Sequence, residues 1–371
     1  MENNRNIKVI ISGGGTGGHV FPAIAIANAL TKKETNIDIL FVGAKDKMEM
    51  KKVPAAGYKI IGLSTMGFQR RMTYKNLFFP FKLLSALLKS RNIIRTFKPD
   101  VVVGVGGYAS GPILKVAVSK GIPTLIQEQN SFPGITNRIL SKKVNKICVA
   151  YNGMENYFPA SKIILTGNPV RQDAVMIENK KKEALEYFGL TSDKKVLLAI
   201  GGSLGARTIN ESVYKNMKFF SENNIQVIWQ TGMSFYETAR ASSVAYGNNA
   251  IKPFYFIDRM DLAYAAADII VSRAGAISVS ELCIVGKPAI LVPSPNVAED
   301  HQTKNAQALI KINAAIIIED TECKENLGKK IVELLDDEEK CITLGKNIKT
   351  LALVNADDNI ADEILNLIEE K

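Results

Sequence analysis

The sequence has few of the residues from which proteins build disulfide frameworks and metal centres. Its 371 residues include four cysteines, two histidines and one tryptophan. The cysteines are widely spaced and form no C-x-x-C pair, which predicts reduced, structural thiols. The two histidines are far apart, and no Asp-x-Asp triplet is present to hold a cation. We therefore expect no metal ion or other cofactor in a catalytic site.

Long hydrophobic runs are also missing. No apolar stretch approaches the roughly 20 residues that span a bilayer, and 46% hydrophobic with 23% charged residues is typical of a soluble globular protein. The few residues before the first predicted strand leave no room for a signal peptide. We therefore expect a protein of the cytoplasm.

The net charge of +10 predicts an anionic partner, which is nucleic acid, an anionic lipid surface or a phosphate-bearing substrate. Charge alone does not choose among them. Because the sequence has no aromatic-basic stacking pattern and no recognised nucleic-acid module, we expect no nucleic-acid partner.

Strand-like apolar runs alternate with helical stretches along most of the chain, as in parallel βαβ units covered by helices. The runs form two series, each opened by a strand that leads into a glycine-rich turn. The predicted fold class is α/β, with two Rossmann-like domains facing a cleft, each with a parallel sheet covered by helices. The predicted strands are residues 8–12, 39–43, 101–105, 124–127 and 146–150, then 196–200, 227–230, 269–272, 289–293 and 315–318.

Gly167-Asn168-Pro169 predicts the link between the domains, because proline disfavours a helix before it and glycine permits a bend. We expect an N-terminal domain at residues 1–167, a C-terminal domain at 168–345 and a C-terminal helix at 346–371, and the whole of residues 342–371 reads as helical. The apolar periodicity of that helix leaves open whether it packs on its own domain or crosses back to the N-terminal one.

The first glycine loop, Gly13-Gly14-Gly15-Thr16-Gly17-Gly18-His19, lies between a strand and a helix expected to start near Pro22. Glycine lets backbone amides approach a ligand, and a helix N-terminus adds partial positive charge, so the loop suits a phosphate; the alternative is a tight turn without a ligand. The loop also satisfies the dinucleotide fingerprint G-x-G-x-x-G. The second strand, however, ends in Gly43-Ala44-Lys45 without the acidic residue that would hold a ribose, which disfavours a nicotinamide or flavin enzyme.

A second loop, residues 104–112, contains Gly106, Gly107 and Tyr108 and again follows a strand. Two such loops in one domain either grip the two phosphates of a diphosphate or make two tight corners. A third loop, residues 201–207, opens the C-terminal domain, and Ser203 offers a hydroxyl beside its amides, which suits another diphosphate.

Two further segments of the C-terminal domain are rich in polar groups. Residues 272–276 lead into a short helix that carries Glu281, whose carboxylate either accepts two adjacent ribose hydroxyls or faces solvent. Residues 300–306 supply amide and imidazole groups that can read sugar hydroxyls.

Of the two histidines, His19 either acts as a general base or orients its loop, and His301 is expected to position donor groups.

In their joint order, these motifs resemble those of the MurG family, bacterial N-acetylglucosaminyltransferases of peptidoglycan synthesis with the two-domain GT-B fold. The resemblance runs over nearly the whole chain. It is carried by Gly14-Gly15-Thr16-Gly17-Gly18-His19, Gly104-Val105-Gly106-Gly107-Tyr108, Gln127-Glu128-Gln129-Asn130, Gly167-Asn168-Pro169-Val170-Arg171, Gly201-Gly202-Ser203-Leu204-Gly205-Ala206, Ser272-Arg273-Ala274-Gly275 and Asp300-His301-Gln302.

The resemblance implies transfer of N-acetylglucosamine from UDP-GlcNAc to undecaprenyl-diphospho-MurNAc-pentapeptide (lipid I). Glu281 would hold the ribose, the backbone of Ile257 would read the uracil, and His19 would be the base, with Asn130 positioning. The acceptor diphosphate would contact Gly14, Gly15, Gly106, Gly107 and Tyr108. The implied donor contacts are Thr16, Gly17, Gly18, Asn130, Arg171, Ser203, Ile257, Ala274, Gly275, Glu281 and Gln302.

Some members of the family carry a second glutamine where this chain has Thr303, which puts one sugar hydrogen bond in doubt.

The nearest alternative function is that of a diacylglycerol glycosyltransferase of similar fold. A nonenzymatic sugar-nucleotide sensor is a further alternative.

A lipid-linked acceptor would require contact with the cytoplasmic face of the cell membrane as a peripheral protein. Residues 68–97 intersperse apolar residues such as Leu77, Phe79 and Phe81 with arginine and lysine, a composition suited to an interfacial helix on anionic lipid. The alternative is an ordinary amphipathic core helix. Other proteins of cell-wall synthesis are further candidate partners.

Overall fold

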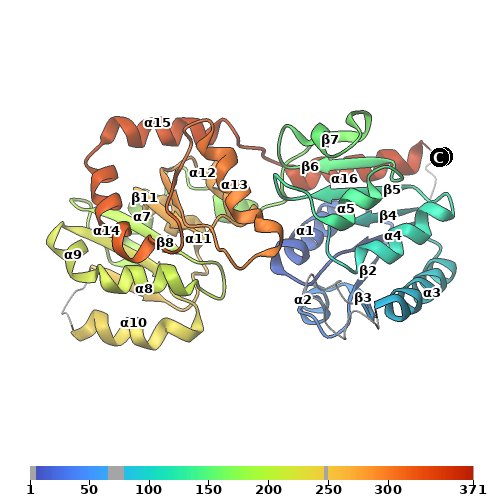
Figure 1. The fold of residues 1–371 in the computed structure, drawn as a ribbon, viewed down its shortest axis with the longest axis horizontal. Helices are drawn as coiled ribbons and strands as arrows, with labels where there is room; N and C mark the ends of the chain where they lie inside the picture. The colour runs from blue at the N-terminus through green and yellow to red at the C-terminus, as the bar shows by residue number, and fades with distance from the viewer. Residues whose placement is uncertain (1–5, 66–78, 246–249, 371) are drawn as a thin grey trace. The chain divides into compact units, whose positions relative to one another are not determined.

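The computed structural model describes residues 6–65, 79–245 and 250–370, and it divides into two compact units (Figure 1). Unit 1 comprises Met1–Val170 with Asn355–Lys371, and unit 2 comprises Arg171–Val354. These divisions lie three and nine residues beyond the boundaries expected at 167 and 345. No helix of the described residues has the length and apolar character needed to cross a bilayer.

Within the described residues, unit 1 contains a seven-stranded parallel sheet in the order β3-β2-β1-β4-β5-β6-β7. Its central strands are continuous apolar runs, because a parallel strand is buried on both faces. The strand order reverses between β1 and β4, the kind of position where α/β sheets bind ligands beyond the carboxyl ends of their strands. The strands are β1 (Ile7–Ser12), β2 (Ile37–Ala44), β3 (Lys59–Leu63), β4 (Val101–Gly104), β5 (Thr124–Glu128), β6 (Lys146–Val149) and β7 (Ile163–Leu165).

Helices cover both faces of this sheet. On one face, α1 (Gly17–Lys33), α2 (Glu49–Ala55) and α16 (Ala356–Glu369) form a core with the side chains of Val9 and Ile11. On the other face, α3 (Phe79–Phe97), α4 (Ser110–Ser119) and α5 (Ile135–Leu140) pack over Ile10. The short helices η2 (Met154–Asn156) and η3 (Ala160–Lys162) lie between β6 and β7.

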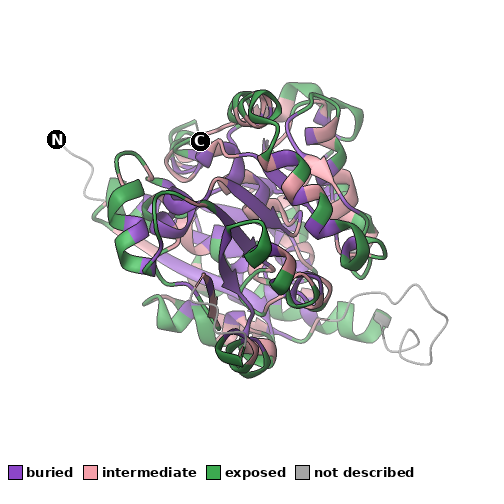
Figure 2. Cartoon of the chain, turned by 90° about the vertical axis from the view of Figure 1, so that its left-hand side faces the viewer, coloured by how far each residue is buried: buried purple, intermediate pink, exposed green. Residues whose placement is uncertain are grey.

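Unit 2 contains, among its described residues, a six-stranded parallel sheet in the order β10-β9-β8-β11-β12-β13, and its order reverses between β8 and β11. Figure 2 shows the strands buried and the helices exposing their outer faces. The core includes the fully buried Trp229 and Phe220. The strands are β8 (Lys195–Ile200), β9 (Ile225–Gln230), β10 (Ile251–Phe254), β11 (Ile269–Ser272), β12 (Ala289–Leu291) and β13 (Ile316–Ile317).

The helices of unit 2 connect these strands and cover its sheet. They are α6 (Gln172–Val175), α7 (Lys181–Phe188), α8 (Arg207–Lys215), α9 (Met217–Glu222), α10 (Met233–Ala245), α11 (Met260–Ala266), α12 (Ala276–Val285), η4 (Ala298–Asp300), α13 (His301–Ile310), α14 (Cys323–Leu335) and α15 (Glu338–Lys349).

The α/β class with two parallel sheets is confirmed, and two local expectations were wrong. Helix α1 starts at Gly17 rather than near Pro22, which lies in its second turn. There the proline ring removes one backbone hydrogen bond, and the buried Ile26 and Leu30 hold the rest of the helix on the core. The segment expected to be helical over 342–371 contains two helices: α15 ends at Lys349, and α16 starts at Ala356 directly after Asn355, whose backbone is left-handed with φ +55°.

Candidate functional site

The first glycine loop occupies the switch point of the unit 1 sheet. Gly14 and Gly15 have φ values of +155° and +90°, which side chains disfavour. Gly17 and Gly18 form the first turn of α1 rather than the preceding loop, and Thr16 is its N-cap. The Gly17 and Gly18 N–H groups precede the first helical hydrogen bonds, which run from His19 and Val20 to the Thr16 carbonyl, so this end of α1 can hold an anion.

His19 lies in that first turn and faces the loop backbone. Its Nδ1 is 3.1 Å from Thr16 Oγ1 and 3.2 Å from the carbonyl oxygen of Gly14. Because a carbonyl oxygen only accepts, the contact with Gly14 assigns the proton to Nδ1. In the neutral imidazole, Nε2 then carries the lone pair that a general base needs.

The structure brings the first and second glycine loops together. A side chain at Gly107 would place Cβ 2.4 Å from the oxygen of Gly14, and one at Gly106 would place Cβ 2.8 Å from Nε2 of His19. Both residues have left-handed φ values, +94° at Gly106 and +83° at Gly107. These glycines are therefore needed for contact between the loops, whether or not a phosphate binds there. Tyr108, next in the loop, is 60% exposed.

Glu128 is a buried carboxylate at the end of β5 whose role the sequence reasoning missed. It accepts hydrogen bonds from the backbone N–H of Asn130 and of Gly134, at 3.1 Å each. It also accepts from the side-chain amides of Asn130, at 3.2 Å, and Asn137, at 2.9 Å. Burial raises the pKa of Glu128, and these donors oppose the shift. The carboxylate thus fixes the loop that carries Asn130. The available signal was a carboxylate at the end of a strand with an apolar centre, Leu125-Ile126.

Gln127 and Gln129, on either side of Glu128, form hydrogen bonds with the second glycine loop and with the segment around Asn168. Gln129 Nε2 donates to the carbonyl of Val105 in the second glycine loop, at 2.8 Å. Gln127 Nε2 donates to Asn168 Oδ1, and Asn168 Nδ2 donates to the carbonyl of Gln129, both at 2.9 Å. All three polar side chains are buried. They connect the carboxyl edge of the sheet to the start of the link into unit 2.

In unit 2, the third glycine loop occupies the corresponding place after β8. Gly205 has φ +77°, and a Cβ there would lie 1.9 Å from the carbonyl oxygen of Thr231. Gly232 in turn has φ +71° and would bring a Cβ within 2.0 Å of the carbonyl oxygen of Leu204. The loop is therefore packed backbone to backbone. Ser203, at its tip, is exposed.

Gln230, which the sequence reasoning also missed, joins this loop to the residue expected to read uracil. Its Nε2 donates to the carbonyl of Gly202 at 3.0 Å, and its Oε1 accepts from the backbone N–H of Ile257 at 2.9 Å. Because the N–H of Ile257 already donates to Gln230, a uracil contact at Ile257 would use its carbonyl group. A contact through the N–H would first require the hydrogen bond to Gln230 to break.

The expected ribose carboxylate lies on α12, whose N-cap is Gly275. Glu281 accepts a hydrogen bond from the hydroxyl of Tyr264 at 2.9 Å. Burial raises the pKa of Glu281, and the hydrogen bond from Tyr264 and the charge of Arg171 oppose the shift. The preceding Ala274 is buried, and its carbonyl accepts from Asn305 Nδ2 at 3.2 Å.

Gln302 lies in the first turn of α13. Its Oε1 accepts from the backbone N–H of Ser294 at 2.8 Å, which directs its amide nitrogen, a donor, elsewhere. Thr303 donates to the Asp300 carboxylate at 2.7 Å. His301 Nε2 lies 3.3 Å from Glu299 Oε2, so the imidazole has a carboxylate neighbour.

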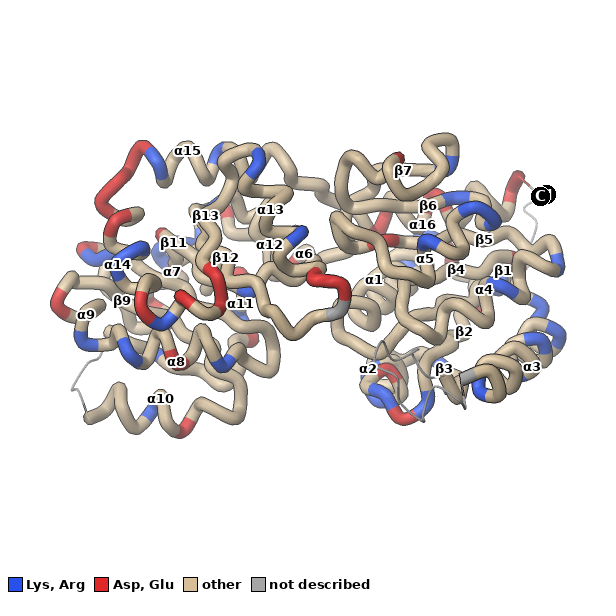
Figure 3. Tube along the Cα trace, in the orientation of Figure 1, with Lys and Arg blue, Asp and Glu red and all other residues tan. Residues whose placement is uncertain are grey.

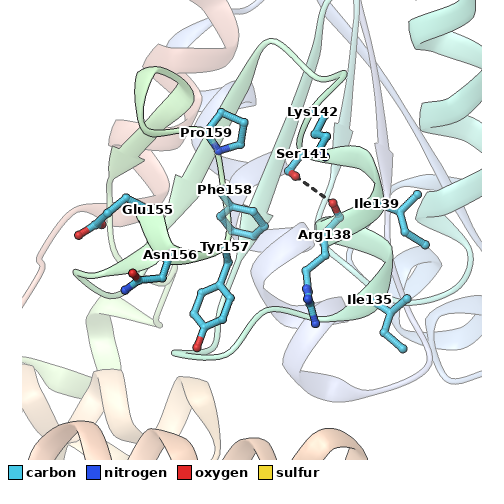
Figure 4. A pocket seen from close by; sticks show the side chains of 10 residues that line it. All are labelled: Ile135, Arg138, Ile139, Ser141, Lys142, Glu155, Asn156, Tyr157, Phe158 and Pro159. Atoms are coloured by element: carbon cyan, nitrogen blue, oxygen red, sulfur yellow. Dashed lines mark hydrogen bonds between the residues drawn. The ribbon is translucent and has the colours of Figure 1, made fainter.

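Unit 1 also contains a cavity of about 490 Å³, and none of the predicted site residues lines it. Figure 4 shows the Arg138 side chain and the Tyr157 ring extending from α5 and from the segment after η2. The described residues contain no group of three or more His, Cys, Asp or Glu placed to hold a metal ion. The cavity lining is Ile135, Arg138, Ile139, Ser141, Lys142, Glu155, Asn156, Tyr157, Phe158 and Pro159.

Two parallel α/β units, each with glycine-rich turns and polar groups at the carboxyl edge of its sheet, define the class of two-domain proteins with a nucleotide-binding type of fold in each half. Family models agree with this class. The glycosyltransferase family 28 N-terminal domain matches residues 9–149, and the family 28 C-terminal domain matches residues 196–360.

Among curated relatives, the UDP-N-acetylglucosamine–N-acetylmuramyl-(pentapeptide) pyrophosphoryl-undecaprenol N-acetylglucosamine transferase of Flavobacterium psychrophilum is 57% identical over 98% of both chains. The Parabacteroides distasonis enzyme of the same name is 54% identical over 99% of this chain and 100% of its own. The chain therefore belongs to glycosyltransferase family 28, in the family of these N-acetylglucosamine transferases.

Solved structures agree. The crystal structure of MurG from Acinetobacter baumannii has a TM-score of 0.80 and 29% identity, over 97% of this chain and 99% of that one. Staphylococcus aureus MnaA with UDP has a TM-score of 0.67 at 15% identity, covering 98% of both chains, and shares the fold alone.

Proposed function

We propose that this protein transfers N-acetylglucosamine from UDP-GlcNAc to the 4-hydroxyl of the MurNAc residue of lipid I, with inversion at the anomeric carbon. The observation that carries the proposal is the 57% identity over 98% of the chain to a relative named for this reaction. The resembling motifs lie at the carboxyl edges of the two sheets, which is where α/β folds bind ligands.

The donor belongs with unit 2 in this proposal. Ser203 and the amides of its loop receive the diphosphate, together with the N-terminus of α12 at Gly275. Glu281 accepts the ribose hydroxyls, and the amide nitrogen of Gln302 donates to the sugar. The first turn of α1, with Thr16, Gly17 and Gly18, adds donors for the transferred group.

The chemical step is a direct displacement. Nε2 of His19 takes the proton of the acceptor 4-hydroxyl while its oxygen forms the bond to the anomeric carbon. The bond from that carbon to the UDP oxygen breaks, and UDP leaves with the electron pair. Backbone amides stabilise the negative charge that develops on the diphosphate. Asn130, held by Glu128, positions the acceptor.

A transfer assay tests the proposal. The full-length protein is given radiolabelled UDP-GlcNAc with a short-chain lipid I analogue or with diacylglycerol, each with and without EDTA. We expect transfer to the lipid I analogue in EDTA and none to diacylglycerol. His19→Ala should lower kcat by about 10² to 10⁴-fold. Transfer to diacylglycerol alone would favour the diacylglycerol glycosyltransferases, and loss of activity in EDTA would contradict catalysis without metal.

Membrane contact through α3 is part of the same proposal. Phe81, Leu84 and Leu88 are 72%, 56% and 61% exposed. Lysines and arginines lie along the same helix (Figure 3), while Ile93 and Ile94 pack on the core. A hollow of about 390 Å³ beside α3 is lined by Leu87, Leu88, Arg91, Val116, Ser119 and Lys120. Exposed apolar and basic side chains together suit the surface of an anionic bilayer.

Sedimentation with liposomes tests this contact, which the predicted peripheral location on the cytoplasmic face of the membrane requires. Residues 68–78 of the predicted segment lie outside the described residues, as does the Phe79 side chain. Serine at both Phe81 and Leu84 should release the protein from vesicles that contain anionic lipid. Val244→Ser, which changes a 75% exposed apolar residue of unit 2, is the control. Unchanged binding by the folded double variant would remove α3 from the proposal.

A further inference from the structure

Glu49 is a buried carboxylate directly beneath the first glycine loop. It is the first residue of α2, and 1% of its surface is exposed. Its Oε2 accepts from the backbone N–H of Gly15 at 3.0 Å, and its Oε1 accepts from the N–H of Ala44, at the end of β2, at 2.9 Å. Both carboxylate oxygens are therefore bonded to backbone.

The fit between this carboxylate and the loop is tight. A Cβ on Gly14 would lie 2.1 Å from Glu49 Oε1, and a Cβ on Gly43 would lie 2.6 Å from Glu49 Cγ. Glycines at positions 14 and 43 thus make room for the glutamate. The loop conformation is supported by a group of the protein itself, so it does not depend on a bound phosphate.

The hydrogen bond between Glu49 and the Gly15 N–H also affects His19, because the adjoining carbonyl of Gly14 contacts the imidazole. The carbonyl of Gly14, which adjoins the Gly15 N–H held by Glu49, is the group that contacts His19 Nδ1 at 3.2 Å. If the peptide between Gly14 and Gly15 turned, that carbonyl would leave the imidazole. The Nδ1 proton and the orientation of Nε2 would then no longer be fixed.

We propose that Glu49 is a positioning residue for the transfer reaction, because it holds the peptide between Gly14 and Gly15 in the orientation that keeps Nε2 of His19 unprotonated and facing the acceptor. This inference rests on the proposed function. It also means that the Gly15 N–H is committed to Glu49, whose negative charge disfavours a phosphate at that amide. An acceptor diphosphate is then held by Gly106 and Gly107 of the second glycine loop rather than by Gly15.

Glu49→Gln is the informative variant, because glutamine has nearly the same shape but only one acceptor oxygen. Either the Gly15 or the Ala44 N–H loses its acceptor. Asp100→Asn is the matched control. Asp100 is 5% exposed in the same unit and accepts from the backbone N–H of Lys8 at 2.9 Å, at the opposite edge of the sheet.

NMR of the histidine rings gives a readout that is independent of activity. The chain has two histidines, so His301, in unit 2, is an internal reference. We expect ¹⁵N and ¹³C shifts of the Nδ1-protonated tautomer for His19 in the wild type and in Asp100→Asn. In Glu49→Gln we expect a mixture of tautomers for His19 and unchanged His301 signals. An unaltered His19 spectrum in both folded Glu49→Gln and folded Glu49→Ala, which removes both acceptor oxygens, would overturn the proposal.

Kinetics with the lipid I analogue complete the test. For Glu49→Gln we expect kcat/KM for the acceptor to fall about tenfold or more, with KM for UDP-GlcNAc within about twofold of wild type. Asp100→Asn should keep both values. A fall in kcat with both KM values unchanged, equal in the two variants, would indicate a structural effect only and contradict the proposal. If the wild type itself transfers nothing, the proposed function fails, while the NMR result still decides whether Glu49 orients His19.

Discussion

The first and third glycine loops have similar sequences and the same place in their units, yet they are supported differently. Both follow the strand from which the order of the sheet reverses. In unit 1, the loop rests on the side chain of Glu49. In unit 2, Gly205 rests on the backbone of Thr231, with no side chain between them. A side chain can move or be replaced, whereas a backbone contact tolerates only glycine, so the two loops should respond differently to the same substitutions.

The largest effect is expected for Gly205→Ala. The new Cβ would meet the Thr231 carbonyl at 1.9 Å, and the φ of +77° adds strain. We expect a loss of about 4 kcal/mol in the free energy of unfolding, measured with urea. Gly202→Ala is the control, because it has φ +82° but nothing within 4 Å of its Cβ. Equal losses of unfolding free energy in the two variants would show that the positive φ, rather than the contact with the Thr231 backbone, accounts for the effect.

Glu128→Gln extends the comparison to a second carboxylate-supported loop. Glutamine would direct an amide nitrogen at groups that are all donors, namely the N–H groups of Asn130 and Gly134 and the Asn137 amide. We expect a loss of about 3 kcal/mol in the free energy of unfolding and a lower kcat through displacement of Asn130. A variant with wild-type stability and kcat would show that the loop holds its shape without the carboxylate.

Gly14→Ala examines the side-chain support directly. Its Cβ would meet Glu49 Oε1, the end of a side chain, so we expect a smaller loss of about 2 kcal/mol. In a Glu49→Ala background the same substitution should lower the free energy of unfolding by about 1 kcal/mol less, because the Glu49 carboxylate that the new Cβ would meet is absent. Additive losses in a double-mutant cycle would contradict direct contact between the two side chains.

The smallest effect is expected from the pH dependence of Glu281→Gln. Burial raises the pKa of Glu281 above its ordinary 4.5, so the folded state keeps this proton to higher pH than the unfolded state. Its contribution to stability is full below pH 4.5 and is lost as the pH rises through the raised pKa. The free energy of unfolding of the variant should therefore decline less steeply with pH above 4.5 than that of the wild type.

The same titration bears on the proposed ribose contact. An ionised Glu281 accepts hydroxyls on both oxygens, so KM for UDP-GlcNAc should fall as the pH rises through its raised pKa. Glu281→Gln should lose that fall. A KM that varies with pH equally in both proteins would assign the dependence to another group.

The sequence by itself determined the central strands and the glycine turns. Runs such as Val101-Val102-Val103 are buried on both faces, and such strands have continuous apolar sequences. The strands that sequence reasoning missed, β3, β7 and β10, are edge strands of the two sheets. Edge strands are partly exposed, and these three have weak patterns, because β7 has only three residues and β3 and β10 contain Lys59 and Lys252. The domain boundaries, the facing of the two domains and the roles assigned to the site residues stay predictions.

Only the tertiary structure decided which core each C-terminal helix joins and what supports the loops. Leu344 of α15 packs in the core of unit 2 and Ile364 of α16 in that of unit 1, although both lie in one helical-looking segment. Gly15 and Glu49 are 34 residues apart, and Gln127 and Asn168 are 41 apart. The physical reason is that local periodicity records which residues are buried, while the partner of a buried polar group is set by how distant strands and helices meet.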